Sequence, residues 1–258
     1  MTLILTHLSQ YGIIHASDSN LTADNMNADI GDKTFAVPFL KAGLTVAGQF
    51  SVSGQRMDVW MRSFIQTQSR EADLTLSGFA HNLADALRAQ MSPKERTHGT
   101  LMHIAGYVQD GAAYHPEFWY VRNVELDPQT GGYCEIPDFR VSEDFWTRDC
   151  PDGNLMEEFQ KDTKAYIIYI NGFSAGRISY LFLQPVMRRF LESIWNNPAW
   201  KFRPPKSLEE SKILVELYMQ VITSLFLLSD YPAQYIGGGT QTCLIPQPEN
   251  IVTSCRTP

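Results

Sequence analysis

Residues 1–20 read MTLILTHLSQYGIIHASDSN, two apolar arms on either side of a short polar break. Both arms are rich in β-branched and apolar residues, and Gly12 stands where the chain must turn, so the pattern predicts a β-hairpin. With the turn centred on the polar break, pairing of the two arms is expected to bring Thr2 beside Asp18 or Ser19. A hydroxyl at the second residue, next to a carboxylate, is suited to N-terminal nucleophile catalysis.

The whole-chain composition is that of a globular protein. The 258 residues are 44% hydrophobic and 19% charged, which is enough apolar material for a sizeable core. The net charge of −7 and the pI of about 5.4 disfavour nucleic acid and anionic membranes as partners. No apolar run reaches the roughly 18 residues of a membrane span, and no basic leader opens the chain, so we expect a cytoplasmic protein.

The cysteines and histidines give no metal pattern. The four cysteines are scattered without a CxxC pair, and we expect reduced thiols. The six histidines show no ligand spacing and are interpreted as scattered structural or surface residues. We therefore expect neither a metal nor another cofactor.

Strands and helices are expected in grouped order. Helical periodicity starts near Ser53 and again over 76–90 and 208–228, and a helix with a disturbance at Pro185 is expected to end near Trp195. Strands are expected over 33–39, 43–48, 101–108, 165–170 and 241–245, with a second hairpin around residues 118–136. The polar stretch 21–32 is expected to be a loop. Grouping of this kind favours an α+β fold.

Several features of the first 50 residues occur together in one known order. They are Thr2, Gly12, Ala16-Ser17-Asp18-Ser19, Lys33 and Ala47-Gly48. In this order and spacing the chain resembles the proteasome β-subunit family of N-terminal nucleophile hydrolases, which includes bacterial proteasome-like proteins. The resemblance implies a four-layer αββα sandwich formed by a single domain over residues 1–258. Residues 138–163 are interpreted as an insertion relative to that family.

The resemblance also implies roles for individual residues. Thr2, once Met1 is removed, would be the nucleophile through Oγ and the base through its own α-amine. Lys33 would tune that amine, Asp18 would hold Lys33, and the Gly48 N–H would form the oxyanion hole. The expected substrate is a peptide or amide, cleaved through an acyl-enzyme.

Two further residues complete the candidate site. Ser174, in a small-residue turn, would assist proton transfer near Thr2. Asp230 corresponds to an acidic residue that the family carries close to Gly237-Gly238-Gly239. The three glycines themselves are expected to allow close packing at the entry of a strand.

Two alternatives stand beside this interpretation. A member of the same family without catalysis would serve as an assembly or binding scaffold, and the resemblance implies homo-oligomers in either case. The sequence Gly172-Phe173-Ser174-Ala175-Gly176 also matches the serine elbow of α/β-hydrolases. That class requires a histidine after the serine, whereas all six histidines precede Ser174, so the elbow is disfavoured.

Overall fold

A computed structural model gives the fold of the chain. It describes residues 2–23, 26–127, 133–143, 159, 162, 166–172, 184–228, 230 and 236–249. The predicted N-terminal hairpin is confirmed: β1 (Leu3–Ser9) and β2 (Gly12–Asp18) pair antiparallel, with Ile4 opposite Ser17.

This hairpin forms the middle of a four-stranded antiparallel sheet of order β12-β1-β2-β13. The outer strands are β12 (Tyr166–Gly172) and β13 (Thr240–Pro246). Every residue of β1 and β2 is buried, because both faces of the sheet are covered. Burial on two sides explains why neither strand alternates apolar and polar residues, and it also buries polar side chains such as Thr6 and His15.

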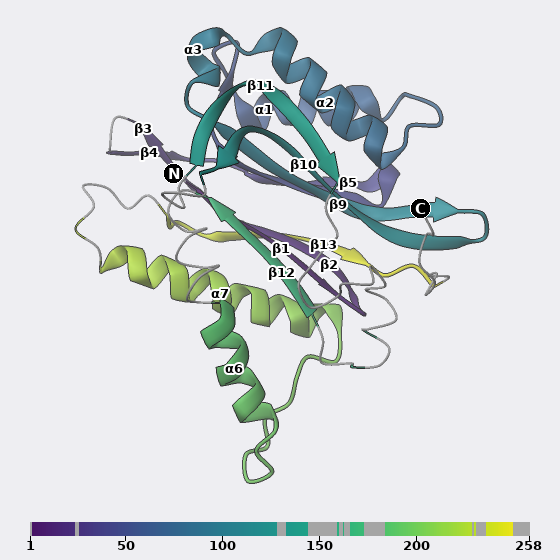
Figure 1. The fold of residues 1–258 in the computed structure, drawn as a ribbon, viewed down its shortest axis with the longest axis vertical. Coiled ribbons are helices and arrows are strands. Elements are labelled where there is room, and N and C mark those ends of the chain that lie inside the picture. Colours follow the sequence, from purple (N-terminus) through teal and green to yellow (C-terminus); the bar gives the residue numbers. More distant parts are fainter. Residues whose placement is uncertain are drawn as a thin grey trace.

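A second antiparallel sheet of five strands lies beside the first, as Figure 1 shows. Its order is β11-β10-β9-β6-β5, and all four neighbouring pairs run antiparallel. The strands are β5 (Thr34–Val37), β6 (Ala42–Gly48), β9 (Thr100–Asp110), β10 (Ala113–Leu126) and β11 (Tyr133–Glu143). The strands predicted over 33–39, 43–48 and 101–108 are thereby confirmed. The first residues of the expected insertion, 138–143, belong to β11, and most of the remainder lies outside the described residues.

Two small two-stranded sheets complete the β structure. They pair β3 (Asn20–Ala23) with β4 (Met26–Ile30), and β7 (Ser51–Val52) with β8 (Gln55–Arg56). The expected loop over 21–32 is therefore wrong, because this polar stretch forms the β3–β4 hairpin. The signal was present but short: Met26-Asn27-Ala28-Asp29-Ile30 alternates apolar and polar residues with the period of a strand, in a stretch otherwise rich in Asn and Asp.

The helices fall into two groups. The first is α1 (Met57–Gln68), α2 (Leu76–Gln90) and the short α3 (Pro93–Arg96); the second is α6 (Gln184–Trp195) and α7 (Leu208–Leu227). One 3-10 turn, η1 (Pro38–Leu40), precedes β6. Helical spacing predicted α2 and α7 to within one residue. Pro185 lies in the first turn of α6, where its missing N–H costs no hydrogen bond.

Apolar clusters hold these elements together. Side chains of α1 and α2 pack on one face of the five-stranded sheet around Phe79 and Val121. Side chains of α7 pack on the outer face of the four-stranded sheet around Tyr218 and Ile14. Between the two sheets, the described side chains form two smaller clusters, one of which contains Ile4 from β1 and Ala47 from β6.

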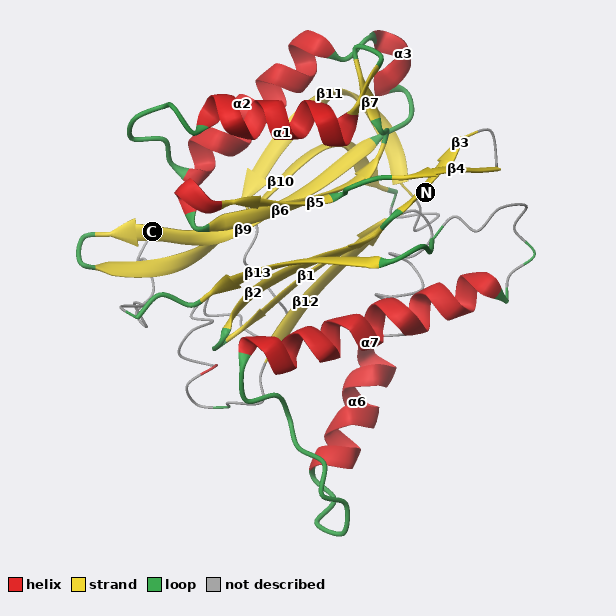
Figure 2. Ribbon diagram, turned by 180° about the vertical axis from the view of Figure 1, so that it is seen from behind, coloured by secondary structure: helices red, strands yellow, loops and turns green. Residues whose placement is uncertain are grey.

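The predicted four-layer αββα sandwich is wrong. The described residues hold more strand than helix, and they form several antiparallel sheets with five helices. Figure 2 shows a physical reason: α7 runs along the four-stranded sheet, whereas α6 projects away from it. Element order alone does not tell how many strands a polar stretch adds or whether a helix lies flat on a sheet. The single domain over residues 1–258 stays a prediction.

Candidate active site

A buried ion pair connects the end of β2 with the residue that precedes β5. Nζ of Lys33 lies 3.2 Å from Oδ1 of Asp18, and the two side chains are 0% and 2% exposed. The Lys33 ammonium also donates to the backbone carbonyl of Asn20. Sequence analysis predicted this pairing, and the structure brings the two residues together as expected.

Burial sets the charge behaviour of the pair. It raises the pKa of Asp18 and lowers the pKa of Lys33, and the attraction between the two groups opposes both shifts. A lysine of lowered pKa exchanges its proton closer to neutral pH than a surface lysine does. The pair is thus suited to tuning a neighbouring acid or base.

The Asp18 carboxylate also holds the start of the chain. Its Oδ1 accepts a hydrogen bond of 2.8 Å from the backbone N–H of Leu3, and its Oδ2 accepts one of 3.2 Å from Gly237 N–H. Leu3 directly follows Thr2, so the carboxylate that holds Lys33 lies one residue from the candidate nucleophile. Thr2 itself is 4% exposed.

The three glycines near the C-terminus enclose this strand end. Gly237 N–H donates to Asp18, and Gly239 N–H donates to Oγ of Ser19 at 2.8 Å. At Gly238, φ is +72°, and a Cβ would stand 2.4 Å from Oγ of Ser19. The predicted close packing at this strand entry is confirmed, because a side chain has no room there.

Gly172 brings β12 into close contact with Thr2. Its φ is +131°, and a Cβ at this position would lie 1.9 Å from the carbonyl oxygen of Thr2. Only glycine fits such an approach. The first glycine of the GxSxG sequence therefore has a positional role in the β1–β12 pairing.

Gly48 ends β6 in the facing sheet. It has φ +103°, and a Cβ would meet the carbonyl oxygen of Gly99 at 2.1 Å. The preceding residue, Ala47, shares an apolar cluster with Ile4 of β1. The end of β6 therefore packs near the start of β1, on the side where the oxyanion hole was expected.

The other two predicted residues do not join this group. Ser174 lies outside the described residues, as does Met1. Asp230 is described and exposed, whereas Asp18 and Lys33 are buried, so its carboxylate is not part of the buried pair.

A second buried polar cluster, which was not predicted, crosses the space between the two large sheets. Oγ1 of Thr6 lies 3.1 Å from Nδ1 of His15 and 3.0 Å from Nδ1 of His103. Nε2 of His15 lies 3.3 Å from the carbonyl oxygen of Ala105, and Nε2 of His103 lies 2.9 Å from the amide nitrogen of Asn171. We call Thr6, His15, His103 and Asn171 the histidine relay.

Hydrogen-bond chemistry gives the histidine relay one direction. A backbone carbonyl only accepts, so neutral His15 carries its proton on Nε2, and its Nδ1 accepts from the Thr6 hydroxyl. That hydroxyl in turn accepts from Nδ1–H of His103, whose Nε2 accepts from the Asn171 amide. The amide oxygen of Asn171 accepts from the Tyr133 hydroxyl. Every donor of the relay then has an acceptor.

Burial keeps both relay histidines neutral. It lowers the pKa of His15 to about 4 and the pKa of His103 well below its usual value. The expectation of structural or surface histidines holds for these two as buried structural residues. The period of two along β1 puts Thr6 on one face with Ile4 and Leu8, but no sequence pattern tells which sheet that face meets.

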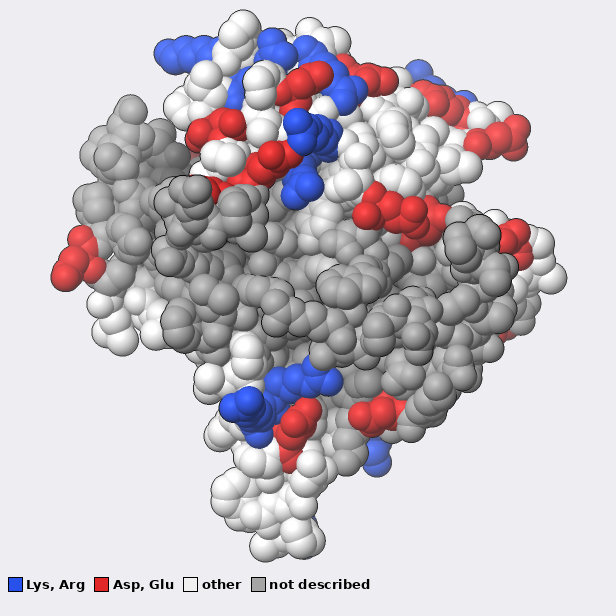
Figure 3. Space-filling view, viewed as in Figure 1, with Lys and Arg blue, Asp and Glu red and all other residues white. Residues whose placement is uncertain are grey.

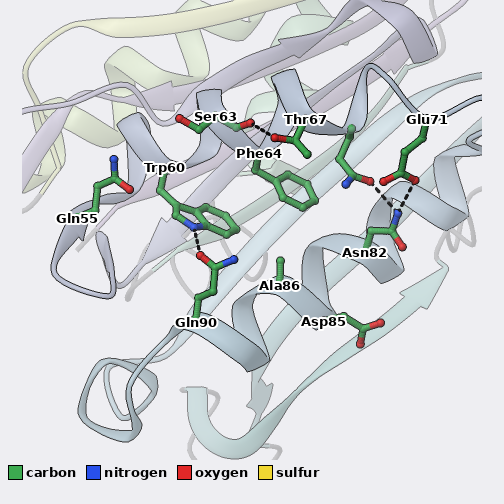
Figure 4. Close-up of a pocket in the computed structure, with 11 residues that line it drawn as sticks. Gln55, Trp60, Ser63, Phe64, Thr67, Glu71, Asn82, Asp85, Ala86 and Gln90 are labelled. Atoms are coloured by element: carbon green, nitrogen blue, oxygen red, sulfur yellow. Dashed lines mark hydrogen bonds between the residues drawn. The ribbon is translucent and has the colours of Figure 1, made fainter.

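A pocket lies away from both of these polar clusters. It is a groove of about 670 Å³ between α1 and α2, on the far face of the five-stranded sheet from the four-stranded one. Figure 4 shows its polar side chains bonded to one another: Asn82 donates to Gln68 and Glu71, and the indole of Trp60 donates to Gln90. We attach no chemistry to this groove.

Three further findings concern the surface charge, metal ligands and the helices. On the face drawn in Figure 3, acidic and basic side chains are intermixed over the upper helices and not separated into patches. In the part of the chain that the structure describes, no three or more His, Cys, Asp or Glu residues are placed to hold a metal ion. None of the described helices has the length and apolarity needed to cross a bilayer.

Comparison with known proteins leaves the family open: no protein-family model and no curated protein matches this chain.

Proposed function

We propose that this chain is a threonine hydrolase resembling the proteasome β-subunit family, which cleaves amide or peptide bonds with Thr2. One observation carries the proposal. A single oxygen of the buried Asp18 carboxylate accepts both from the Lys33 ammonium and from the backbone N–H of Leu3. A buried lysine of lowered pKa therefore shares its carboxylate with the residue that directly follows Thr2.

The chemistry needs a free α-amine on Thr2. That amine accepts the proton of Oγ, and Oγ attacks the substrate carbonyl carbon. The Gly48 N–H is expected to donate to the oxygen that becomes negative. The amine then passes its proton to the leaving nitrogen as the C–N bond breaks, and water hydrolyses the ester by the reverse proton transfers. Lys33 and Asp18 adjust the local charge so that the amine is neutral at the start.

A non-catalytic scaffold is the second candidate. It is favoured by the large apolar side chains that α6 and α7 leave exposed, among them Phe190, Ile213 and Leu217. Exposed apolar side chains on neighbouring helices suit self-association, which the family resemblance also implies. Both candidates include a homo-oligomer, and only the first requires chemistry at Thr2.

The test is the intact mass of the purified protein before and after exposure to a peptide epoxyketone. This warhead reacts with a hydroxyl and a free amine on one residue, so a single adduct requires a processed N-terminal threonine. We expect loss of Met1, one adduct, and no adduct on Thr2→Ala. Retained Met1, or an adduct that survives in Thr2→Ala, would rule out the hydrolase and leave the scaffold.

A further inference from the structure

Arg122 has an arrangement that the fold does not explain. It lies on β10 between Tyr120 and Val124, two residues whose side chains pack between the large sheets. Its guanidinium stands over the Tyr120 ring, 5.8 Å from the centroid. The Arg122 side chain therefore points into the space between the sheets and is only partly exposed.

The Nε of Arg122 is buried, and it has no hydrogen-bond partner in the part of the chain that the structure describes. Leaving a buried donor of a charged group unsatisfied is costly in free energy. Arg140, the residue opposite on β11, differs: it is 62% exposed and pairs with Glu125. Arg122 is thus the less exposed of these two arginines, and it lacks an acceptor among the described residues. A ligand that supplies an acceptor would satisfy it.

The position of Arg122 relates it to the candidate active site. Burial raises the pKa of Tyr133 to about 12, and the positive charge of Arg122 opposes this rise. The Tyr133 hydroxyl donates to Asn171, and the next residue, Gly172, lies against the carbonyl of Thr2. Tyr133 therefore links the surroundings of Arg122 to the strand end that lies against Thr2.

We propose that Arg122 binds a carboxylate of the substrate, so that the preferred substrates are peptides or amides with an acidic group near the scissile bond. The side edge of a guanidinium, with Nε–H and one Nη–H, matches the two oxygens of a carboxylate. The carboxylate comes from an acidic side chain or from a free chain terminus. This inference rests on the proposed function for the meaning of "substrate", but the binding itself does not require catalysis.

The experiment measures binding without turnover, in the full-length Thr2→Ala protein, by isothermal titration calorimetry. Three peptides serve as probes: acetyl-Ala-Ala-Glu-amide, acetyl-Ala-Ala-Gln-amide and acetyl-Ala-Ala-Gln with a free C-terminus. We expect at least one acidic peptide to bind tenfold or more tightly than the neutral amide. Which of the two does so distinguishes a side-chain carboxylate from a terminal one.

Substitutions assign that preference to Arg122. Arg122→Met and Arg122→Gln, two variants of different polarity, are each expected to reduce it at least tenfold. Arg140→Met, which removes the cation opposite on β11, is expected to keep it. Equal affinity for all three peptides, or a preference that survives in both Arg122 variants, would overturn the proposal. A carboxylate preference combined with no epoxyketone adduct would instead show that the anion site exists and the hydrolase does not.

Discussion

The backbone N–H of Leu3 donates to Oδ1 of Asp18 at 2.8 Å, so the side chain of the last residue of β2 holds the first residue of β1. Strand pairing alone would bring the two chain segments alongside each other. The side-chain bond adds a defined position for the residue before Leu3, which is Thr2.

Asp18→Asn is expected to lower the free energy of unfolding by about 3–5 kcal/mol, because it leaves the Lys33 ammonium buried without its anion. Urea unfolding at pH 7 measures the loss. Asp29→Asn, at a pair with Arg56 in which both side chains are largely exposed, is the matched control and should change stability by less than about 1 kcal/mol.

The double variant Asp18→Asn with Lys33→Met separates stability from chemistry. It removes the stranded charge, so we expect it to recover most of the lost stability. Because the ion pair is absent, we expect the double variant to form no epoxyketone adduct even though it is stable. Adduct formation at the wild-type rate in this variant would contradict the role given to the pair.

Gly172→Ala is expected to slow adduct formation at Thr2 at least tenfold. The new Cβ would overlap the Thr2 carbonyl oxygen, so β1 and β12 must separate at this end. Gly111→Ala is the control, since Gly111 also has positive φ but no heavy atom within 4 Å of its Cβ position. The measurement is the adduct rate by mass spectrometry; equal rates in the two variants would show that Gly172 does not position Thr2.

Gly48→Ala is expected to lower the free energy of unfolding by about 1–3 kcal/mol more than Gly54→Ala does. Both glycines have positive φ, at +103° and +73°. Only Gly48 would place its Cβ against a backbone carbonyl, that of Gly99, whereas the Gly54 position is open. Thermal or urea unfolding of the two variants measures the difference, and its absence would mean that the β6 end relaxes freely.

Stability is expected to fall as the pH drops from 6.5 towards 4. The folded chain holds His7 and His15 neutral, with pKa values lowered by burial to about 3 and about 4, while unfolded histidine titrates at about 6.5. In this window the unfolded state binds protons that the folded state does not. Each such histidine therefore lowers the free energy of unfolding by up to about 1.4 kcal/mol for each unit by which the pH falls.

His7→Phe gives the sharpest readout of this effect. His7 stacks on Tyr166, with ring centroids 5.5 Å apart, and its Nδ1 has no hydrogen-bond partner among the described residues, so phenylalanine keeps the contact and removes one titrating group. Urea unfolding at several pH values should show that the free energy of unfolding of His7→Phe falls less steeply with pH than that of the wild type, by the contribution of one proton. The difference between wild type and variant cancels the opposing contribution of Asp18. An equal pH dependence of stability in wild type and His7→Phe would contradict the prediction.

Local patterns in the sequence were sufficient for the elements that have a strong apolar face. The β1–β2 hairpin follows from two apolar arms around Gly12, and α2 follows from the spacing of Phe79, Leu83 and Leu87. The ion pair of Asp18 and Lys33 was also expected, because the family-like spacing of the first 50 residues implied it. Such features depend on residues close in sequence or on a single strand pairing.

Other features required the tertiary structure. The β3 and β4 strands are only four and five residues long, and the direction in which α6 leaves the sheet depends on packing, so the fold class was predicted wrongly. His103 meets Thr6 from 97 residues away, and nothing near either residue indicates it.

The sequence by itself determined the strands and helices with clear apolar periodicity and the candidate residues at the chain start, because these depend on local spacing. Only the tertiary structure decided what the polar residues of the strands do. A polar side chain on one face of a strand has the same sequence signature whether that face meets water or a second sheet. Burial between the sheets turned Thr6, His15 and His103 into a directed relay, and it left Nε of Arg122 without an acceptor among the described residues.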